Sequence, residues 1–222
     1  MIGLVFTGGR QPDMTVALSY FGEYSLVAAA DSGLDAAFSA GIEPDYIVGD
    51  MDSLSDPAML DRFPADRVRR WPRDKDYTDT ELALALLSDE GCEDIILIGG
   101  SGGRMDHFFA LKALFDKKKS PSCWIGDSSI LLAAGSGCRS GILSVSGLHP
   151  EEPVSVFPAG SERCRCRGKG FYWEVDGLDW DRGGYSLSNR SVSGTVRLEV
   201  SAGRFLLVLP LRSGLVFEWP ES

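Results

Sequence analysis

Short apolar runs alternate with segments of helical periodicity over the first half of the chain. Runs typical of β-strands occupy residues 2–6, 26–30, 46–48, 67–71 and 95–98. Helix signals lie between them, at residues 12–20, 34–40, 56–63, 78–91 and 105–117. Strands and helices that alternate in this way form a mostly parallel sheet, because right-handed crossovers place the connecting helices on both faces. The pattern predicts a doubly wound α/β domain with a mostly parallel sheet over residues 1–127.

The helix that follows Thr78 has the clearest local signature. Thr78 and Glu81 have the T-x-x-E spacing of a capping box, and Gly91 ends the segment. A second start signal is Asp56 followed by Pro57, which suits an N-cap and a first-turn proline. We therefore expect helices to begin at both places.

The second half of the chain has a different texture. Short β-type runs occupy residues 129–133, 142–145, 154–157, 170–175, 195–200 and 205–209, and Gly, Pro, Ser and Asp turns separate them. Arginine and cysteine alternate strictly over residues 163–167, which on a strand places cysteine inward and arginine outward. We predict an all-β sandwich domain over residues 128–222.

Composition and charge exclude several classes of function. Of 222 residues, 44% are apolar, so the chain can bury a sizeable core, but no segment approaches the ~20 apolar residues that span a bilayer. Residues 1–127 carry 12 basic and 22 acidic side chains, which accounts for the whole net charge of −10. A field of that sign opposes nucleic acid. Five cysteines and two histidines form no zinc-ligand pattern, and we expect reduced thiols and a cytoplasmic location.

Three acidic clusters follow apolar runs and are the candidates for chemistry. They are Asp50-Met51-Asp52, Asp76-Tyr77-Thr78-Asp79 and Arg104-Met105-Asp106. Segments just past the ends of parallel strands share one edge of a sheet, so these clusters can converge on one site. Two carboxylates one residue apart exceed what a turn needs, and they suit Mg²⁺, which takes a few carboxylates, waters and phosphate oxygens.

Two further features suit phosphate. Lys75, Asp76 and Thr78 lie at the start of a helix, where free backbone amides bind phosphate. Residues 99–103 are glycine-rich and lead into Arg104, whose planar guanidinium fits phosphate oxygens. The glycine run satisfies neither G-x-G-x-x-G nor the P-loop pattern, so neither a dinucleotide site nor a Walker-type site is indicated.

The succession of these motifs resembles the thiamine pyrophosphokinase family. The residues that carry the resemblance are Ala30-Asp31-Ser32-Gly33, Val48-Gly49-Asp50-Met51-Asp52-Ser53, the run from Lys75 to Leu84, the run from Gly99 to His107, Lys169-Gly170-Phe171-Tyr172-Trp173 and Ser186-Leu187-Ser188-Asn189. Two positions depart from the family pattern: Asp31-Ser32-Gly33-Leu34-Asp35 stands where Asp-Gly-Gly-Ala-Asn is usual, and Leu111 stands where Asn is frequent.

The resemblance implies transfer of pyrophosphate from ATP to the hydroxyl of thiamine, giving thiamine pyrophosphate and AMP, by a homodimer with the thiamine site between its subunits. It implies that Mg²⁺ is held by Asp50, Asp52 and Asp79. The implied catalytic residues are Asp31, Asp50, Asp52, Asp79, Arg104 and Asp106; those implied for ATP are Lys75, Asp76, Thr78, Gly102 and Arg104, and those for thiamine are Ser188 and Asn189.

Other functions fit parts of the same pattern. A Mg²⁺-dependent phosphatase would use Asp50 as an aspartyl nucleophile. A nucleotide-sugar transferase would use the Asp-x-Asp pair as its metal site. A nucleotide sensor would bind without turnover. Release of AMP from ATP and thiamine without a phospho-aspartate distinguishes the pyrophosphokinase from the phosphatase.

Overall fold

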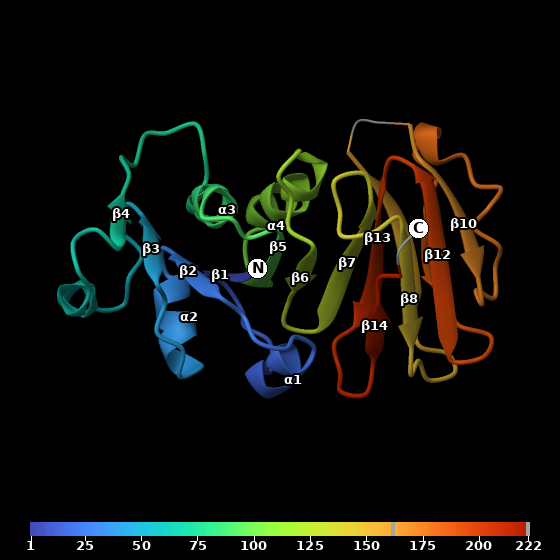
Figure 1. Cartoon of the computed structure of the whole chain (residues 1–222), viewed down its shortest axis with the longest axis horizontal. Coiled ribbons are helices and arrows are strands. Elements are labelled where there is room, and N and C mark those ends of the chain that lie inside the picture. Colours follow the sequence, from blue (N-terminus) through green and yellow to red (C-terminus); the bar gives the residue numbers. More distant parts are fainter. Residues whose placement is uncertain (161–162, 221–222) are drawn as a thin grey trace.

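A ten-stranded sheet runs through the whole molecule, which is a computed structural model that describes residues 1–160 and 163–220 (Figure 1). Its strand order is β11-β9-β13-β7-β6-β5-β1-β2-β3-β4, and a separate four-stranded sheet has the order β10-β12-β8-β14. The strands of the first half are β1 (Ile2–Thr7), β2 (Leu26–Ala30), β3 (Tyr46–Gly49), β4 (Val68–Arg70), β5 (Asp94–Gly99) and β6 (Cys123–Ile125). Neighbours among these six strands all pair in parallel, as the alternating pattern predicts.

Helices cover both faces of the parallel section. They are α1 (Met14–Ser19), α2 (Gly33–Ser39), α3 (Asp79–Asp89) and α4 (Met105–Ala113), with 3₁₀ turns η1 (Pro57–Arg62), η2 (Leu114–Asp116) and η3 (Trp180–Arg182). In Figure 1, α1 and α2 lie below the sheet, and α3 and α4 lie above it. The chain moves outward from β1 to β4 and then returns past β1 to form β5. Ligands of open α/β sheets bind at the carboxyl ends of the strands beside such a reversal.

Apolar residues of β1 face both layers of helices. Leu4 and Phe6 join a core with Ala17 and Ala37 of the lower helices, whereas Val5 joins a second core that includes side chains of α3. All of these positions on β1 are fully buried. A strand covered on both faces reads as an uninterrupted apolar run, which is how the sequence predicted it.

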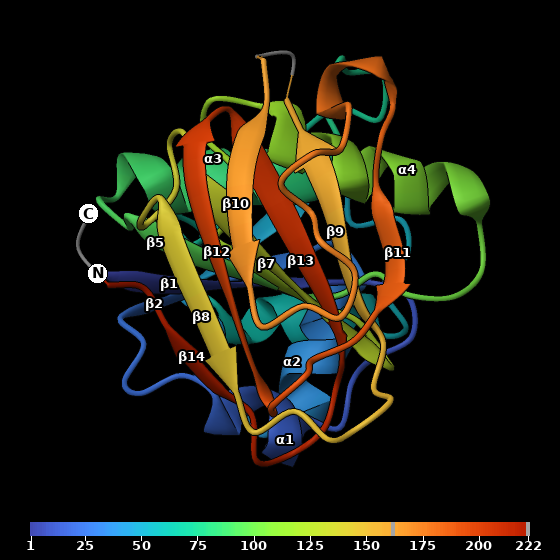
Figure 2. The same ribbon diagram turned by 90° about the vertical axis from the view of Figure 1, so that its right-hand side faces the viewer.

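The second half of the chain forms a sandwich of two antiparallel sheets. Its strands are β7 (Ser129–Gly135), β8 (Ile142–Ser146), β9 (Val154–Ala159), β10 (Arg165–Lys169), β11 (Ser186–Asn189), β12 (Thr195–Ala202), β13 (Arg204–Pro210) and β14 (Val216–Glu218). Figure 2 shows the four-stranded sheet in front of the end of the long sheet. Leu143 and Leu198 from one sheet and Val156 and Leu207 from the other belong to the same buried cluster.

The short strand β6 joins the two halves, and the sequence pattern did not reveal it. It pairs in parallel with β5 and antiparallel with β7. The predicted boundary between residues 127 and 128 lies in the turn from β6 to β7, where the amide of Gly126 donates to the carbonyl of Ser129. The long sheet continues across that turn, and the division into domains 1–127 and 128–222 stays a prediction.

Two other sequence predictions about secondary structure were wrong, and a third was confirmed in part. The helix predicted to begin at Asp56 is the 3₁₀ helix η1, and Asp56 caps it through the amide of Ala58 as expected. Residues 170–175 are not a strand, because β10 ends at a tight turn where Gly170 has φ +82° and a Cβ would lie 2.1 Å from the carbonyl oxygen of Thr195. Strand β11 occupies residues that the pattern assigned to a loop.

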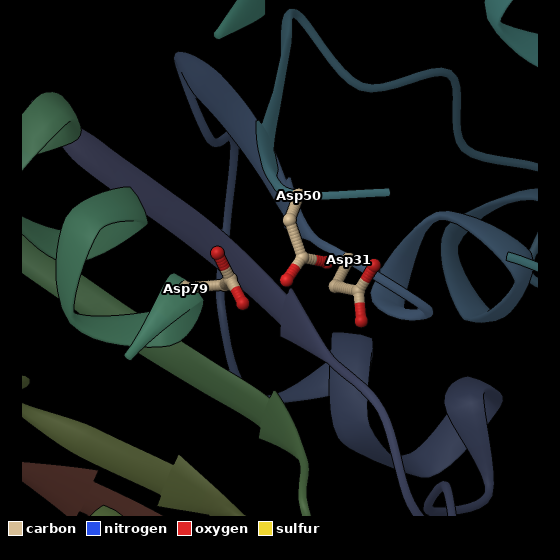
Figure 3. Close-up of side chains that lie close together, drawn as sticks. All are labelled: Asp31, Asp50 and Asp79. Atoms are coloured by element: carbon tan, nitrogen blue, oxygen red, sulfur yellow. The ribbon is translucent and has the colours of Figure 1, made fainter. Parts of the chain in front are cut away.

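The carboxyl edge of the parallel section gathers the acidic residues. Asp31 directly follows β2, Asp50 directly follows β3, and Asp79 is the first residue of α3 (Figure 3). The loops after β1 and β5 flank the same edge, because these two strands are neighbours at the chain reversal. The fold therefore places the candidate site where the topology favours one.

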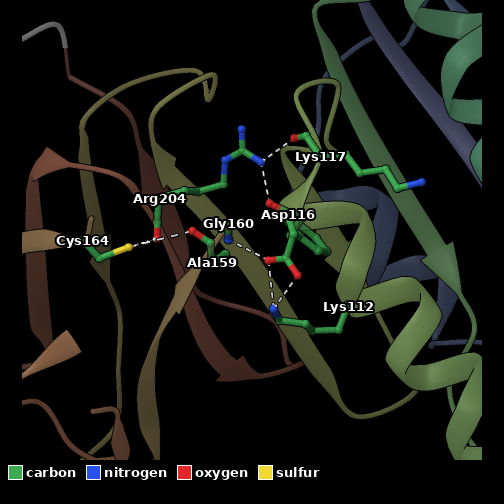
Figure 4. Close-up of polar contacts among 8 residues, drawn as sticks. Lys112, Asp116, Lys117, Ala159, Gly160, Cys164 and Arg204 are labelled. Carbon is green, nitrogen blue, oxygen red and sulfur yellow. Dashed lines mark hydrogen bonds and ion pairs between the residues drawn. The ribbon is translucent and has the colours of Figure 1, made fainter. Parts of the chain in front are cut away.

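Arg204 ties the two halves together (Figure 4). Its side chain is 7% exposed and has no carboxylate partner among the residues that the structure describes. Its Nε donates to the carbonyl of Ser136 at 2.9 Å, and its Nη1 donates to the carbonyls of Phe115 and Lys117 at the end of η2. A guanidinium suits this position because a cation is favoured where a helix ends in unpaired carbonyls.

We expect Arg204→Met to lower the free energy of unfolding by about 2–4 kcal/mol. The buried carbonyl of Phe115 loses this donor at a cost of about 1–3 kcal/mol, and the part-buried carbonyls of Ser136 and Lys117 lose weaker bonds. Urea unfolding followed by tryptophan fluorescence measures the change. Arg167→Met is the control, because Arg167 is exposed on β10. Equal stability of the two variants would contradict the proposed contribution of Arg204.

Candidate active site

Three carboxylates converge at the edge of the parallel sheet. One oxygen from each of Asp31, Asp50 and Asp79 lies within 4.8 Å of the others, and all three side chains are partly buried. Figure 3 shows the three side chains close together, each from a separate part of the fold. Two of the three acidic clusters contribute to this group, through Asp50 and Asp79. Asp106 of the third cluster does not join it, and Asp31 comes from outside the clusters.

Local backbone geometry makes the convergence possible. Asp31 has φ +49°, in the left-handed region that short polar side chains tolerate. At Gly49 a Cβ would lie 3.1 Å from Asp79 Oδ1, tighter than an ordinary contact. Glycine before Asp50 thus leaves room for the carboxylate of α3, as close backbone approach to a site requires.

Burial, hydrogen bonds and neighbouring charges shift the pKa of two of these carboxylates. Burial raises the pKa of Asp31, and repulsion from Asp79 and Asp50 raises it further, while hydrogen bonds from Ser53 oppose the shift. The pKa of Asp50 is lowered, first by the backbone hydrogen bond from Asp52, whose amide donates to Asp50 Oδ1 at 3.1 Å, and also by Lys75 and Arg73. Two carboxylate oxygens, Asp31 Oδ1 and Asp79 Oδ1, are buried and accept no hydrogen bond. Such oxygens are suited to a hard divalent cation.

Asp52 lies outside this group. Its side chain is 46% exposed, its Oδ2 lies 3.6 Å from Arg73 Nε, and its Oδ1 accepts a hydrogen bond from Ser53 Oγ at 3.0 Å. The motif predicted Asp50, Asp52 and Asp79 as the metal ligands, whereas the structure brings Asp31 to the other two. A residue's place in an Asp-x-Asp pair does not determine which way its side chain turns.

A cavity of about 320 Å³ adjoins the carboxylates. Its lining comes from the loops after β1, β2, β3 and β5 and from the starts of α3 and α4; it comprises Thr7, Gly8, Gly9, Ala30, Asp31, Ser32, Ser53, Thr78, Asp79, Thr80, Gly100, Gly102, His107, Ala110 and Leu111. The hydroxyls of Thr7 and Thr80 lie 2.8 Å apart in its wall. No sequence motif marks the hydroxyls of Thr7 and Thr80, so the sequence did not single them out.

The glycine-rich loop after β5 is packed against the loop after β1. The amide of Arg10 donates to the carbonyl of Ser101 at 2.7 Å, and a Cβ at Gly102 would lie 2.6 Å from Arg10 Cδ. A Cβ at Gly100 would lie 2.2 Å from Leu111 Cδ1. Leu111, one of the departures from the family pattern, therefore fills the space over Gly100. The glycines here serve close packing.

Asp35, in the other departure, has a structural partner. Its carboxylate accepts hydrogen bonds from Ser55 Oγ at 2.6 Å and from the Ser55 amide at 3.2 Å. These bonds tie α2 to the loop that follows Asp50. Asp35 thus supports the loop without lining the cavity.

The remaining predicted nucleotide residues lie near the cavity rim. Arg104 and Asp106 are exposed and pair with each other, Nε to Oδ1 at 3.1 Å and Nη2 to Oδ2 at 2.5 Å, and this lowers the pKa of Asp106. Asp76 is exposed, and Lys75 is turned toward Asp79. Thr78 caps α3 by accepting the amide of Glu81 at 3.2 Å. The reciprocal half of the capping box is absent here, because Glu81 pairs with Lys117 instead.

Ser188 and Asn189 lie at the opposite end of the long sheet, on its edge strand β11. The Asn189 side chain is buried and fully engaged: Oδ1 accepts the amides of Trp173 and Arg190, and Nδ2 donates to the Trp173 carbonyl and to Ser186 Oγ. Ser188 is exposed with φ +53°. Within one chain these two residues do not meet the carboxylates.

Comparison with known proteins shows similarity to thiamin pyrophosphokinases. Residues 17–125 match the family model "Thiamin pyrophosphokinase, catalytic domain". The matched residues lie in the α/β half, which is therefore similar to the catalytic domain of that family. The chain is also 33% identical, over 98 residues, to thiamine pyrophosphokinase from Bacillus subtilis (strain 168), an alignment that covers 44% of either sequence. The aligned part thus spans less than half of that relative.

Solved structures of thiamin pyrophosphokinases share the fold over nearly the whole chain. The Bacillus subtilis structure has a TM-score of 0.71 at 21% identity and covers 95% of this chain and 99% of its own. The Geobacillus thermodenitrificans structure has a TM-score of 0.68 at 23% identity, with 96% and 99% covered. The Candida albicans structure has a TM-score of 0.69 at 16% identity, with 95% and 90% covered. The family fold therefore includes the β-rich half.

Among the described residues, no helix has the length and apolar character that a membrane crossing requires.

We expect Asp31→Asn, Asp50→Asn and Asp79→Asn each to weaken binding of Mn²⁺ at least tenfold, a loss of about 1.4 kcal/mol or more. Each change removes a carboxylate from the group whose oxygens converge. Calorimetric titration of Mn²⁺ measures the affinity. Asp106→Asn is the control, since its carboxylate is paired with Arg104 outside the group. An unchanged affinity in all three variants would exclude this group as a metal site.

Proposed function

We propose that the chain transfers pyrophosphate from ATP to the hydroxyl of thiamine, giving thiamine pyrophosphate and AMP. The observation that carries the proposal is the convergence of Asp31, Asp50 and Asp79 beside a cavity, in a chain whose α/β half matches the catalytic domain of this family. The phosphatase and sensor alternatives gain no support from the comparisons.

The carboxylates would hold Mg²⁺, which would neutralise charge on the phosphate oxygens when bound. Asp31, Asp50 and Asp79 offer converging oxygens, and the buried Oδ1 atoms of Asp31 and Asp79, which accept no hydrogen bond, fit such an ion. Asp52 stays a proposed metal ligand at the rim of the site. Its ion pair with Arg73 would have to open before its carboxylate could join the other three.

The nucleotide would lie across the starts of α3 and α4. The first turn of α3 leaves backbone N–H groups without partners inside the helix, and these attract phosphate. Lys75, Asp76, Thr78, Gly102 and Arg104 stay the proposed ATP residues, with Asp106 as a catalytic residue beside Arg104. Such transfer depends on positioning and charge stabilisation, so no covalent nucleophile on the protein is needed.

A homodimer with a shared thiamine site is part of the proposal. Ser188 and Asn189 lie far along the sheet from the carboxylates, so a second copy would have to bring them together. Two apolar surfaces are exposed: Met105, Phe108 and Phe109 on α4, and a group near β11 formed by Tyr172, Trp173, Tyr185 and Leu187. Large exposed apolar groups of this kind favour an interface.

A cytoplasmic location also stays a proposal, in keeping with free thiols at Cys92, Cys123, Cys138 and Cys166.

With ATP, thiamine and Mg²⁺, we expect the purified protein to release AMP and thiamine pyrophosphate in equal amounts. Asp50→Asn should lower kcat about a thousandfold, equivalent to about 4 kcal/mol of transition-state stabilisation. Asp52→Asn should cost less, because Asp52 lies outside the converging group. Chromatography of the nucleotide and thiamine products measures both. Release of inorganic phosphate with a trapped phospho-aspartate would favour the phosphatase instead.

We expect Phe109→Ser to shift the protein from dimer to monomer and to reduce thiamine turnover with it, because a large ring that is 62% exposed would lose its apolar partner. Sedimentation velocity measures the assembly. Tyr24→Ser is the matched control, since Tyr24 is an exposed aromatic residue away from both apolar surfaces. A fully active monomer would refute a site shared between subunits.

A further inference from the structure

The ammonium of Lys75 is held against the carboxylate group. The side chain of Lys75 is 11% exposed, although most of its neighbours in the loop before α3 are exposed. Its Nζ lies 3.0 Å from Asp79 Oδ1 and donates to the carbonyl of Pro72 at 3.1 Å. A lysine that is this well buried needs a charge partner, and Asp79 is that partner.

The three carboxylates of Asp31, Asp50 and Asp79 need a nearby cation, just as the ammonium of Lys75 needs an anion. Three carboxylate oxygens within 4.8 Å of one another repel, and the repulsion is strongest where water is excluded. Asp79 Oδ1 is buried and accepts no hydrogen bond, so the ion pair with Lys75 is the compensation that the described residues provide.

The carboxylate of Asp79 has two competing uses. Asp79 belongs to the group that would coordinate a divalent cation, and Lys75 now neutralises its carboxylate through Oδ1. An ammonium 3.0 Å from a carboxylate oxygen and a Mg²⁺ ion bound to the same carboxylate repel each other strongly, because both are cations at short range. Lys75 sits in the loop before α3, beyond the capping residue Thr78, so its side chain can turn without unwinding the helix.

We propose that Lys75 is the internal counter-ion of the carboxylate group in the metal-free protein, and that a divalent cation binds only as the ammonium leaves Asp79. This rests on the proposed metal site. The released ammonium is then available to the oxygens of a polyphosphate, so the metal and the nucleotide bind with positive coupling, each strengthening the other by the same factor.

Removal of the ammonium should therefore lower the stability of the metal-free protein and raise its affinity for Mn²⁺. Lys75→Met leaves three carboxylates without their counter-ion, so the metal-free variant should unfold at a lower temperature than the wild type. The same variant should bind Mn²⁺ about tenfold more tightly, because no resident cation has to be displaced. A lysine that merely stabilised the fold would show the first effect without the second.

The test measures Mn²⁺ binding by electron paramagnetic resonance of the free ion, and thermal unfolding with and without Mn²⁺, on protein freed of metal by a chelator. Lys119→Met is the control, because Lys119 also pairs with an aspartate, Asp89, but on the exposed surface. Lys75→Gln, which keeps a polar side chain, should change Mn²⁺ affinity in the same direction as Lys75→Met. A non-hydrolysable ATP analogue should tighten Mn²⁺ binding in the wild type more than in either variant.

The outcomes separate this inference from the proposed function. If the wild type binds Mn²⁺ and both Lys75 variants bind it equally or more weakly, the counter-ion inference is overturned and the metal site stands. If neither the wild type nor the variants bind Mn²⁺, with or without the ATP analogue, the metal site itself is overturned together with the inference. The inference is supported if both Lys75 variants bind Mn²⁺ more tightly than the wild type does.

Discussion

Repulsion among three carboxylates is the constraint on which the candidate site depends. Asp31, Asp50 and Asp79 are held together by elements whose own packing is apolar and extensive, since β2, β3 and α3 are buried against a common core. That packing keeps the carboxylates close despite their charge. Lys75 offsets part of this repulsion, and the remaining negative charge of the three carboxylates attracts a cation. A site of this kind is maintained by the rigidity of the scaffold around it.

The site lies at the edge of the sheet where the strand order reverses between β1 and β5. Strands β1 and β5 are neighbours, and the loops that follow them interlock through Arg10 and Ser101. The interlocked loops form one wall of the cavity, and the start of α3 forms another. Glycines at positions 100 and 102 permit the close contact. The cavity is therefore shaped by backbone packing, and its chemistry comes from the few side chains that point into it.

The β-rich half is joined to this scaffold by more than a linker. Strands β6 and β7 continue the long sheet, and Arg204 binds carbonyls from both sides of the junction. The junction restrains the position of β11, and with it Ser188 and Asn189, relative to the carboxylates of the same chain. This geometry is the reason why the proposed thiamine site requires a second copy.

The sequence by itself determined the class of fold, because strand and helix periods alternate regularly and the apolar runs of β1, β2 and β5 are long enough to be buried on both faces. It also marked Asp50 and Asp79 as candidate metal ligands, because Asp50 follows a strand signal and Asp79 follows the helix cap at Thr78. The tertiary structure alone decided that Asp31 joins them while Asp52 turns toward Arg73, since side-chain direction depends on neighbours far away in the chain. It alone revealed β6 and β11, which are short strands whose pairing comes from adjacent strands rather than from their own pattern.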